Sequence, residues 1–415
     1  MLVRQPFPYL AMMAVASLST TPSSVLVNAF SIVTTPPHSS FKTTTSLHAT
    51  TATSKTTTTA DLITFDLDDT IFPVGPVVNE ANQALIKHLN ECGFDQITQE
   101  SLIASTKLIR NDLLSNENKV ITYTELRQRA ICYEMNHNHN DDDNNNNNRD
   151  EYKYTDSNVI QAYDIWEMNR HLAAERHLYH DTIPMLQVLK EKYPNAIIGA
   201  ITNGKGNPLH MKQTICEYFD FCISGEDENV FPYRKPHEQI YQKSLDFFFN
   251  LKRGDSDDHD NDNDNDNDND EEKKNICWVH VGDDLANDVG ASAKCGALAV
   301  WADLNEEEYN QSASKRFPKE TSKKEKDENN NNDMNSGIKS ETTNGNAAEV
   351  PNQPFWSTAT KEEIEKRKKL NDASMKFVSA RIERLSDLPD TIQDMVTGTG
   401  STETSIKHNE KVENY

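Results

Sequence analysis

Two carboxylates, Asp66 and Asp68, stand at the end of an apolar, β-prone run at 62–67, and Thr70 follows just beyond them. Carboxylates are rarely buried without a partner, because removing them from water is costly. A polar turn also explains this segment when it is taken alone, since Asp-Asp-Thr is ordinary turn chemistry. The segment therefore offers two acids for catalysis or metal binding and leaves the purely structural interpretation open.

The same arrangement recurs far along the chain. The apolar run 276–281 leads through Gly282 into a second pair of acids, Asp283 and Asp284, and Asp288 follows. In a parallel sheet the residues that follow each strand lie at one common edge, where ligands bind. We therefore expect the two groups of acids to meet there.

Two further segments add a hydroxyl, an amide and a cation. The run 196–201 ends in Thr202 and Asn203, and Lys235 precedes a proline in a loop. Each segment is a common turn or loop by itself. Their order along the chain and their position after strands indicate one shared site.

Carboxylates gathered in this way need either raised pKa values or a cation. Two of them roughly 4 Å apart repel by about 4 kcal/mol at an effective dielectric of about 20. Mg²⁺ is a hard cation that prefers oxygen ligands, and it would neutralise a bound phosphate. A carboxylate nucleophile can form an acyl phosphate, while a lysine and a hydroxyl stabilise charge on the phosphoryl oxygens. These residue types therefore point to phosphoryl transfer.

In type, spacing and order, these residues resemble the four motifs of the haloacid dehalogenase-like hydrolase superfamily. The resemblance covers about 61–303 and includes a last piece at 375–396. It rests on Asp66, Asp68 and Thr70, then Thr202 and Asn203, then Lys235, and finally Asp283, Asp284 and Asp288. It implies an α/β fold: a doubly wound, Rossmann-like parallel sheet with an α-helical cap inserted after the first motif.

The resemblance also implies roles for the acids. Asp66 is similar to the family's nucleophile. Asp68 is similar to the general acid that protonates the leaving group and then activates water. The implied Mg²⁺ ligands are Asp66, the backbone carbonyl of Asp68, and Asp283, with Thr70 in support. Asp68 favours a phosphatase over a dehalogenase, because a dehalogenase has no leaving group to protonate.

The remaining motif residues are implied to bind the phosphate or to support the site. Thr202 and Asn203 correspond to phosphate-binding positions, and Lys235 to the lysine next to the nucleophile. Asp288 would orient Lys235 or a metal-bound water, and Asp284 would support the metal ligands.

The sequence thus predicts a Mg²⁺-dependent phosphatase that hydrolyses a small phosphorylated metabolite through an aspartyl-phosphate intermediate. A phosphoglucomutase-type phosphotransferase and a non-catalytic binding module that uses the Asp/Asn-rich tracts are the alternatives. The sequence defines neither the substrate nor the oligomeric state.

The acidity of the chain bears on its partners. It has 415 residues with a net charge of −24, and only 35% are hydrophobic. The stretches 141–148, 255–272 and 305–352 bury too little apolar surface to fold and are predicted to be disordered. Nucleic acid is excluded as a partner, because phosphate contacts need clustered Lys and Arg. The Asp-Asn alternation at 260–270 could bind Ca²⁺ weakly, but it lacks the Gly and Glu of an EF-hand loop, and a solvated tract explains it better.

The first sixty residues resemble a targeting leader. They contain no acid, and a weakly apolar stretch ends in the small-residue pattern 27–29, followed by a Ser/Thr-rich segment. This arrangement is similar to a bipartite plastid leader, with a mitochondrial or secretory leader as the alternative. No later run is apolar enough to span a bilayer, so the mature form is expected to have no membrane segment. The six scattered cysteines favour free thiols.

The pattern along the chain alternates strands and helices. Strands are predicted at 62–67, 196–201, 221–223, 276–281, 297–301 and 377–382. Helices are predicted at 79–92, 100–115, 122–136, 157–178, 181–193, 208–219, 237–249 and 285–295. The alternation indicates a doubly wound sheet.

The predicted organisation has seven parts. They are a cleavable leader at 1–60, a first core segment at 61–74, an α-helical cap at 75–180 with a disordered loop near 138–150, a second core segment at 181–304 with a disordered loop near 253–274, a disordered insertion at 305–372, a last core strand and helix at 373–396, and a disordered tail at 397–415. An independent helix at 361–385 is the alternative to the last strand. The cap arginines Arg110, Arg127, Arg129 and Arg170 can contact an anionic substrate, but a solvated helix face explains each of them better.

Overall fold

The computed structural model describes residues 59–117, 120–138, 152–253, 276–309 and 361–398. The predicted leader, the Asp/Asn-rich tracts and most of the predicted insertion and tail lie outside the described residues. The plastid destination therefore stays a prediction. Within the described residues, no helix is both long enough and apolar enough to cross a membrane.

Six parallel strands form one sheet in the order β3-β2-β1-β4-β5-β6. The strands are β1 Leu62–Phe65, β2 Ile197–Thr202, β3 Phe221–Ser224, β4 Trp278–Gly282, β5 Leu298–Ala302 and β6 Ala380–Ile382. The first strand in the chain lies inside the sheet, as in doubly wound α/β folds. The predicted fold class is confirmed, and each predicted strand is present.

The register of the central strands brings the polar segments together. Phe65 pairs with Ala200 of β2 and with Val281 of β4. Because the strands are parallel, the residues that follow them meet at the carboxyl edge of the sheet. The first, second and fourth strands therefore deliver Asp66, Thr202 and Asp283 to the same place.

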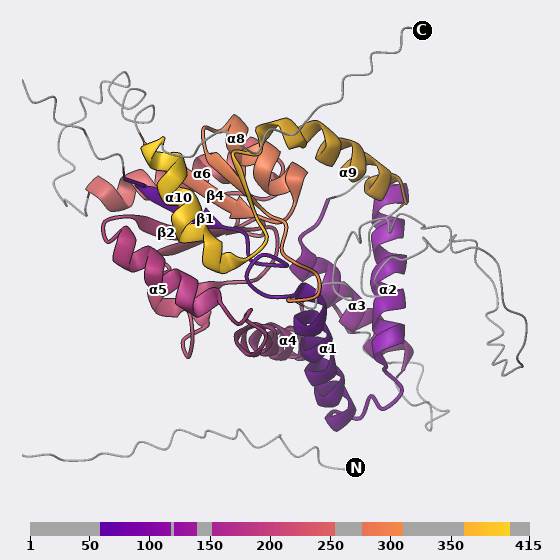
Figure 1. Ribbon diagram of the computed structural model, residues 1–415. Helices are drawn as coiled ribbons and strands as arrows, with labels where there is room; N and C mark the ends of the chain where they lie inside the picture. The colour runs from indigo at the N-terminus through magenta and orange to yellow at the C-terminus, as the bar shows by residue number, and fades with distance from the viewer. Residues whose placement is uncertain (1–58, 118–119, 139–151, 254–275, 310–360, 399–415) are drawn as a thin grey trace, which may run out of the picture. The chain divides into compact units, whose positions relative to one another are not determined.

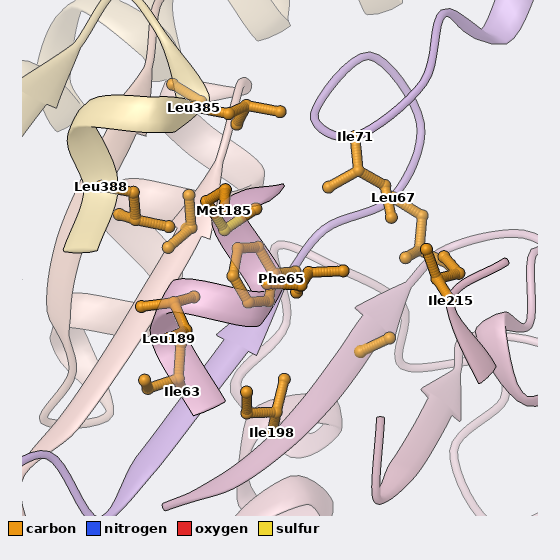
Figure 2. Close-up of a cluster of buried hydrophobic side chains, with 14 of the residues drawn as sticks. Ile63, Phe65, Leu67, Ile71, Met185, Leu189, Ile198, Ile215, Leu385 and Leu388 are labelled. Atoms are coloured by element: carbon orange, nitrogen blue, oxygen red, sulfur yellow. The ribbon is translucent and has the colours of Figure 1, made fainter. Parts of the chain in front are cut away.

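Helices cover both faces of the sheet. Ile63 belongs to an apolar cluster with α5 (Thr182–Lys192) and α10 (Leu388–Thr397), which lie side by side in Figure 1. Figure 2 shows part of this cluster. The neighbouring Leu62 packs with α6 (Glu238–Arg253) on the opposite face. Burial on both faces explains why the strand sequences are continuously apolar rather than alternating.

Between β1 and α5 the chain forms four helices with an apolar core of their own. These helices are α1 Val74–Glu91, α2 Gln99–Asp112, which continues into a π-helix at Leu113–Glu117, α3 Tyr123–His137 and α4 Ser157–Arg176. Leu85, Ile131 and Trp166 are buried together in this core. These helices, called here the α1–α4 unit, occupy the segment in which the cap is predicted.

The predicted helix at 208–219 is wrong. The segment contains two short 3₁₀ helices, Pro208–His210 and Cys216–Tyr218, joined by turns. Met211 and Ile215 are four residues apart and fully buried, and their spacing suggested a helix. Packing against the sheet buries both side chains without a continuous helix, so tertiary contacts overrode the local pattern.

The predicted helix at 285–295 is present in two parts. A π-helix at Leu285–Gly290 leads into α8, Ala291–Lys294. Gly290 lies at the junction, where a Cβ atom would come within 2.3 Å of the hydroxyl of Ser374. The absence of a side chain therefore lets a later segment of the chain pack closely here.

That later segment is α9, Lys361–Ser374, followed by a 3₁₀ turn at Met375–Phe377. The prediction of a disordered insertion is wrong for residues 361–372, which form most of α9. The Lys/Glu-rich sequence of α9 has no clear apolar stripe, and polar contacts with the segment 284–290 hold the helix. The chain then forms β6, a 3₁₀ turn at Leu385–Asp387 and α10, so the predicted closing strand is confirmed.

Candidate active site

A cavity of about 360 Å³ lies at the carboxyl edge of the sheet. With the exception of Thr70, every residue of the four motifs lines it: Asp66, Asp68, Thr202, Asn203, Lys235, Asp283, Asp284 and Asp288. The topology thus gathers residues from four separate segments of the chain. A cavity of this size suits a small ligand.

Lys235 bridges two of the acids. Its Nζ lies 2.5 Å from Oδ1 of Asp66 and 2.7 Å from Oδ1 of Asp288, and all three side chains are buried. Burial by itself would lower the pKa of Lys235, but Asp288 and Asp66 outweigh burial and raise the pKa above its usual range. Lys235 is therefore a fixed positive charge beside Asp66.

The two carboxylates respond differently to this lysine. Burial raises the pKa of Asp66, and the negative charges of Asp288 and Asp68 add to the increase, although Lys235 opposes it. Burial also acts to raise the pKa of Asp288, but Lys235 and His280 overcome it and hold the pKa low. Asp288 is thus the principal counterion of Lys235, and Asp66 is the less compensated carboxylate.

Asp283 is held by Thr70, which lies two residues after Asp68. The backbone N–H of Asp283 donates to Oγ1 of Thr70 at 3.1 Å, and Thr70 is fully buried. The indole N–H of Trp301 donates to the Asp283 carbonyl at 3.0 Å. Burial strongly raises the pKa of Asp283, with further contributions from Asp69 and other acids. Thr70 therefore fixes the backbone of Asp283.

Three carboxylates can share one cation. Oxygen atoms of Asp66, Asp283 and Asp288 lie within 4.8 Å of one another. Their oxygen donors are the ligands that Mg²⁺ prefers, and the raised pKa values of Asp66 and Asp283 indicate negative charge that lacks compensation. The residues present therefore fit a divalent cation. This set contains Asp288, for which the family resemblance implies an orienting role and not metal binding.

Asp284 organises the segment that carries Asp288. Its Oδ1 accepts hydrogen bonds from the backbone N–H groups of Ala286 and Asn287, at 2.9 and 2.8 Å. Its own N–H donates to Oδ2 of Asp288 at 3.1 Å. Gly282 is required nearby, because a Cβ atom there would lie 2.4 Å from the Asp288 side chain.

Asn203, which follows Thr202 at the end of β2, holds the loop that carries Lys235. The side chain of Asn203 accepts from the Lys235 N–H at 2.8 Å and donates to the Lys235 carbonyl at 3.1 Å. Both polar groups of its amide thus hold the lysine in place. The hydroxyl oxygen of Thr202 accepts from the Gly204 N–H at 3.2 Å.

A buried polar chain lies behind the site and was not predicted from the sequence. The Trp278 N–H donates to Oγ1 of Thr64 at 2.8 Å, and this hydroxyl lies 2.8 Å from Nδ1 of His280. Nε2 of His280 lies 3.7 Å from Oδ1 of Asp288. Burial lowers the pKa of His280, although Asp288 opposes the decrease. Only the tertiary structure places this imidazole beside Asp288.

Arg170 of α4 reaches the second acid of the first pair. Its Nη2 lies 2.7 Å from Oδ1 of Asp68, and its side chain is only 3% exposed. The interpretation of Arg170 as a solvated residue is therefore wrong. Gly206 permits the contact, since a Cβ atom there would lie 2.8 Å from Nη1 of Arg170. The sequence around Arg170 contains no pattern that would predict its pairing with Asp68.

The other three arginines singled out in the α1–α4 unit have partners within the unit or in α9. Arg110 pairs with Glu363 of α9 at 2.6 Å, and Arg129 pairs with Glu125 one turn away. Arg127 lies over the ring of Trp166. None of the three lines the cavity.

Glu226 joins the loop after β3 to the α1–α4 unit. Its carboxylate accepts from the N–H groups of Tyr123 and Thr124 at the start of α3, at 3.0 and 2.9 Å. It also pairs with Arg234 at 2.6 Å, and its side chain is 1% exposed. Because Arg234 directly precedes Lys235, this contact couples the position of α3 to the lysine loop.

We expect Glu226→Gln to lower the free energy of unfolding by about 1–3 kcal/mol, because hydrogen bonds to charged groups contribute about that much. Urea denaturation would measure the loss. Glu125→Gln, which breaks the more exposed pair with Arg129, is the matched control and should cost at most about 1 kcal/mol. Equal losses in the two variants would contradict the prediction.

Three comparisons with known proteins show what the chain is similar to. A model of the family described as haloacid dehalogenase-like hydrolase matches residues 60–254. A comparison with curated protein sequences finds no match. Among solved structures, a 2-haloacid dehalogenase from Pseudomonas syringae pv. Tomato DC3000 is 17% identical, with 80% of this chain and 98% of that chain covered and a TM-score of 0.45.

Two phosphatase structures are also similar. A predicted phosphoglycolate phosphatase from Haemophilus somnus 129pt is 14% identical, with 59% of this chain and 85% of that chain covered and a TM-score of 0.31. A phosphatase of the same superfamily from Thermococcus onnurineus is 21% identical, with 59% and 87% covered and a TM-score of 0.27.

Proposed function

Residues 60–254 place the chain in the haloacid dehalogenase-like hydrolase family, and from this premise we propose that the protein is a Mg²⁺-dependent phosphatase of a small phosphorylated metabolite. The observation that carries the proposal is the second acid, Asp68, in the same cavity as Asp66 and Lys235. Cleavage of an alkyl phosphate produces an alkoxide that must be protonated, and Asp68 offers that proton. Hydrolysis of a carbon–halogen bond needs no such acid.

Asp66 is the nucleophile in this proposal. Its carboxylate oxygen attacks phosphorus, the bond from phosphorus to the leaving oxygen breaks, and an acyl phosphate forms on Asp66. Asp68 gives its proton to the leaving oxygen. Asp68 then takes a proton from water as the water attacks the acyl phosphate, and inorganic phosphate leaves.

The surrounding residues prepare the charges for this step. Lys235, held by Asn203 and paired with Asp288, keeps a positive charge next to the oxygen of Asp66. That charge favours the ionised nucleophile and would stabilise negative charge on the phosphoryl group. Thr202 would add a hydroxyl donor to the same group.

Asp66, Asp283 and Asp288 are the residues that would hold Mg²⁺. When bound, the cation supplies positive charge that offsets both the clustered acids and the phosphate. The carbonyl of Asp68 stays a predicted ligand. Asp288 would then serve two positive partners, the cation and Lys235.

The direct test is phosphate release by residues 60–415 from a panel of phosphorylated metabolites, with Mg²⁺ and after its removal by chelation. We expect release that depends on Mg²⁺ and is concentrated on one chemical class. We also expect Mg²⁺ to raise the melting temperature, because it binds the folded acid cluster and not the unfolded chain. A folded protein that releases no phosphate from any compound would reject the phosphatase and favour the phosphotransferase or the binding module.

Arg170 provides a test of the role of Asp68. Its guanidinium holds Oδ1 of Asp68, which leaves Oδ2 for proton transfer. We expect Arg170→Met to lower kcat by about 10²-fold for alkyl phosphates, in the range of general acid catalysis. The decrease should be smaller for 4-nitrophenyl phosphate, whose leaving group needs little protonation.

The matched control for this prediction is Arg176→Met on the same helix, which removes an exposed pair with Glu80. It should leave the ratio of the two activities unchanged. An equal decrease for both substrates in Arg170→Met would show that Arg170 does not act through the proton donor.

A further inference from the structure

The helix α9 presents one polar face to the functional site. Glu363, Arg367, Asn371 and Ser374 follow one another at spacings of four, four and three residues, which places them along one side of a helix. Glu363 pairs with Arg110 of α2, and Figure 1 shows the two helices meeting. Ser374 packs against Gly290 at the other end.

The middle of this face enters the cavity. Arg367 and Asn371 both line it, together with Asp66 and Lys235. The amide oxygen of Asn371 accepts from the Ala286 N–H at 2.9 Å and fixes the helix to the acid-bearing segment. This contact gives α9 a defined register over the site.

The charges of the cavity make Arg367 unusual. Among the described residues that line the cavity, seven are aspartates and only Lys235 and Arg367 are basic. Lys235 is enclosed between Asp66 and Asp288 and serves the reacting end of the cavity. Arg367 comes from a different element and is therefore the cation that remains for another part of the ligand.

The guanidinium of Arg367 retains donors for a ligand. Within the described part of the chain, its polar contacts go through Nη1, which donates to Oδ1 of Asn287 and lies 3.7 Å from Oδ1 of Asp284. A guanidinium has five N–H donors in a planar fork that fits a carboxylate or phosphate. Its side chain is 20% exposed, so it is held in place and still reachable.

We propose that Arg367 binds a second anionic group of the substrate and so makes the enzyme selective for phosphate esters that carry a carboxylate or another phosphate. This inference rests on the proposed phosphatase function and adds the substrate class to it. Asn371 acts as a positioning residue that sets the register of α9, while Arg367 makes the contact.

Two matched pairs of compounds test the proposal. In each pair the first member carries the second anion: 3-phosphoglycerate with glycerol 3-phosphate, and fructose 1,6-bisphosphate with fructose 6-phosphate. For the wild-type protein with Mg²⁺, we expect kcat/KM to be at least 10-fold higher for the anionic member of one pair. In Arg367→Met this preference should fall by at least 10-fold, mainly through KM, and Arg367→Lys should restore part of it.

Lys369→Met is the matched control, because Lys369 lies on the exposed side of α9 and its loss changes the net charge equally. It should retain the preference. Melting temperatures of all variants establish that they are folded. The absence of a preference in both pairs, or a preference that survives in Arg367→Met, would overturn the inference.

Binding separates this inference from the phosphatase proposal. Calorimetry with the Asp66→Asn protein measures the Kd of each compound without turnover. Suppose that the anionic member binds more tightly, that this tighter binding requires Arg367, and that the wild-type protein releases no phosphate. This combination would support the inference and reject the phosphatase. Phosphate release without any contribution of Arg367 to binding would do the reverse.

Discussion

Asp66→Asn is expected to abolish phosphate release, with a decrease in kcat of at least about 10³-fold, because an amide cannot form the acyl phosphate. Asp288 remains as a partner of Lys235 in this variant, so the protein should stay folded. Phosphate release measures the loss. Acid-quenched wild-type protein should also carry a hydroxylamine-sensitive phosphate that the variant lacks.

The control for this substitution is Asp95→Asn, which makes the same chemical change at an exposed position outside the cavity. It should retain the wild-type rate. If Asp66→Asn retained activity within a few-fold of the wild type, Asp66 would not be the nucleophile, and the non-catalytic binding module would become the better account of the chain.

Lys235→Met is expected to lower the free energy of unfolding by about 3–5 kcal/mol in the absence of metal, because it leaves Asp66 and Asp288 buried without their shared cation. The side chain of Lys235 is 3% exposed, so it compensates the two carboxylates largely out of contact with bulk water. Activity should be lost as well. Urea denaturation in the presence of a chelator measures the stability.

Two comparisons identify the cause of that loss. Lys192→Met removes a surface pair with Asp390, which is 85% exposed, and should cost at most about 1 kcal/mol. Adding Asp288→Asn to Lys235→Met removes one of the two unpaired charges and should recover part of the stability. Mg²⁺ should raise the melting temperature of Lys235→Met more than that of the wild type, since it supplies the missing charge. A double variant less stable than Lys235→Met would contradict this explanation.

The α9 helix shows where sequence patterns fail. Its Lys/Glu-rich composition buries little apolar surface and therefore predicts disorder, yet Lys361–Ser374 form a helix. The helix is held by polar contacts of Arg367 and Asn371 with the segment 284–287, and such contacts leave no periodic signal in the sequence. The prediction for 208–219 erred in the opposite way. The spacing of its apolar residues is helical, but the segment packs against the sheet without a continuous helix.

The backbone conformation of Asp69 is a feature that sequence patterns did not predict. Among the described non-glycine residues, only Asp69 has a positive φ, 61°. Its carboxylate accepts a hydrogen bond at 3.0 Å from the backbone N–H of Val74, at the start of α1. Aspartate tolerates this left-handed conformation better than most residues, because its short side chain bonds locally. The turn after the first acids therefore leads directly into the α1–α4 unit.

The sequence by itself determined the sheet and the acids at its edge. Buried parallel strands must be continuously apolar, and the polar residues that end such runs must lie at the carboxyl edge of the sheet. The sequence therefore predicts that Asp66, Thr202 and Asp283 lie close together. The resemblance also placed Lys235 next to the nucleophile, but only the tertiary structure decided which further side chains compensate the acids. Arg170 beside Asp68, and Arg367 in the cavity, depend on contacts between segments more than sixty residues apart, and pairing across such separations is set by packing and electrostatics rather than by local pattern.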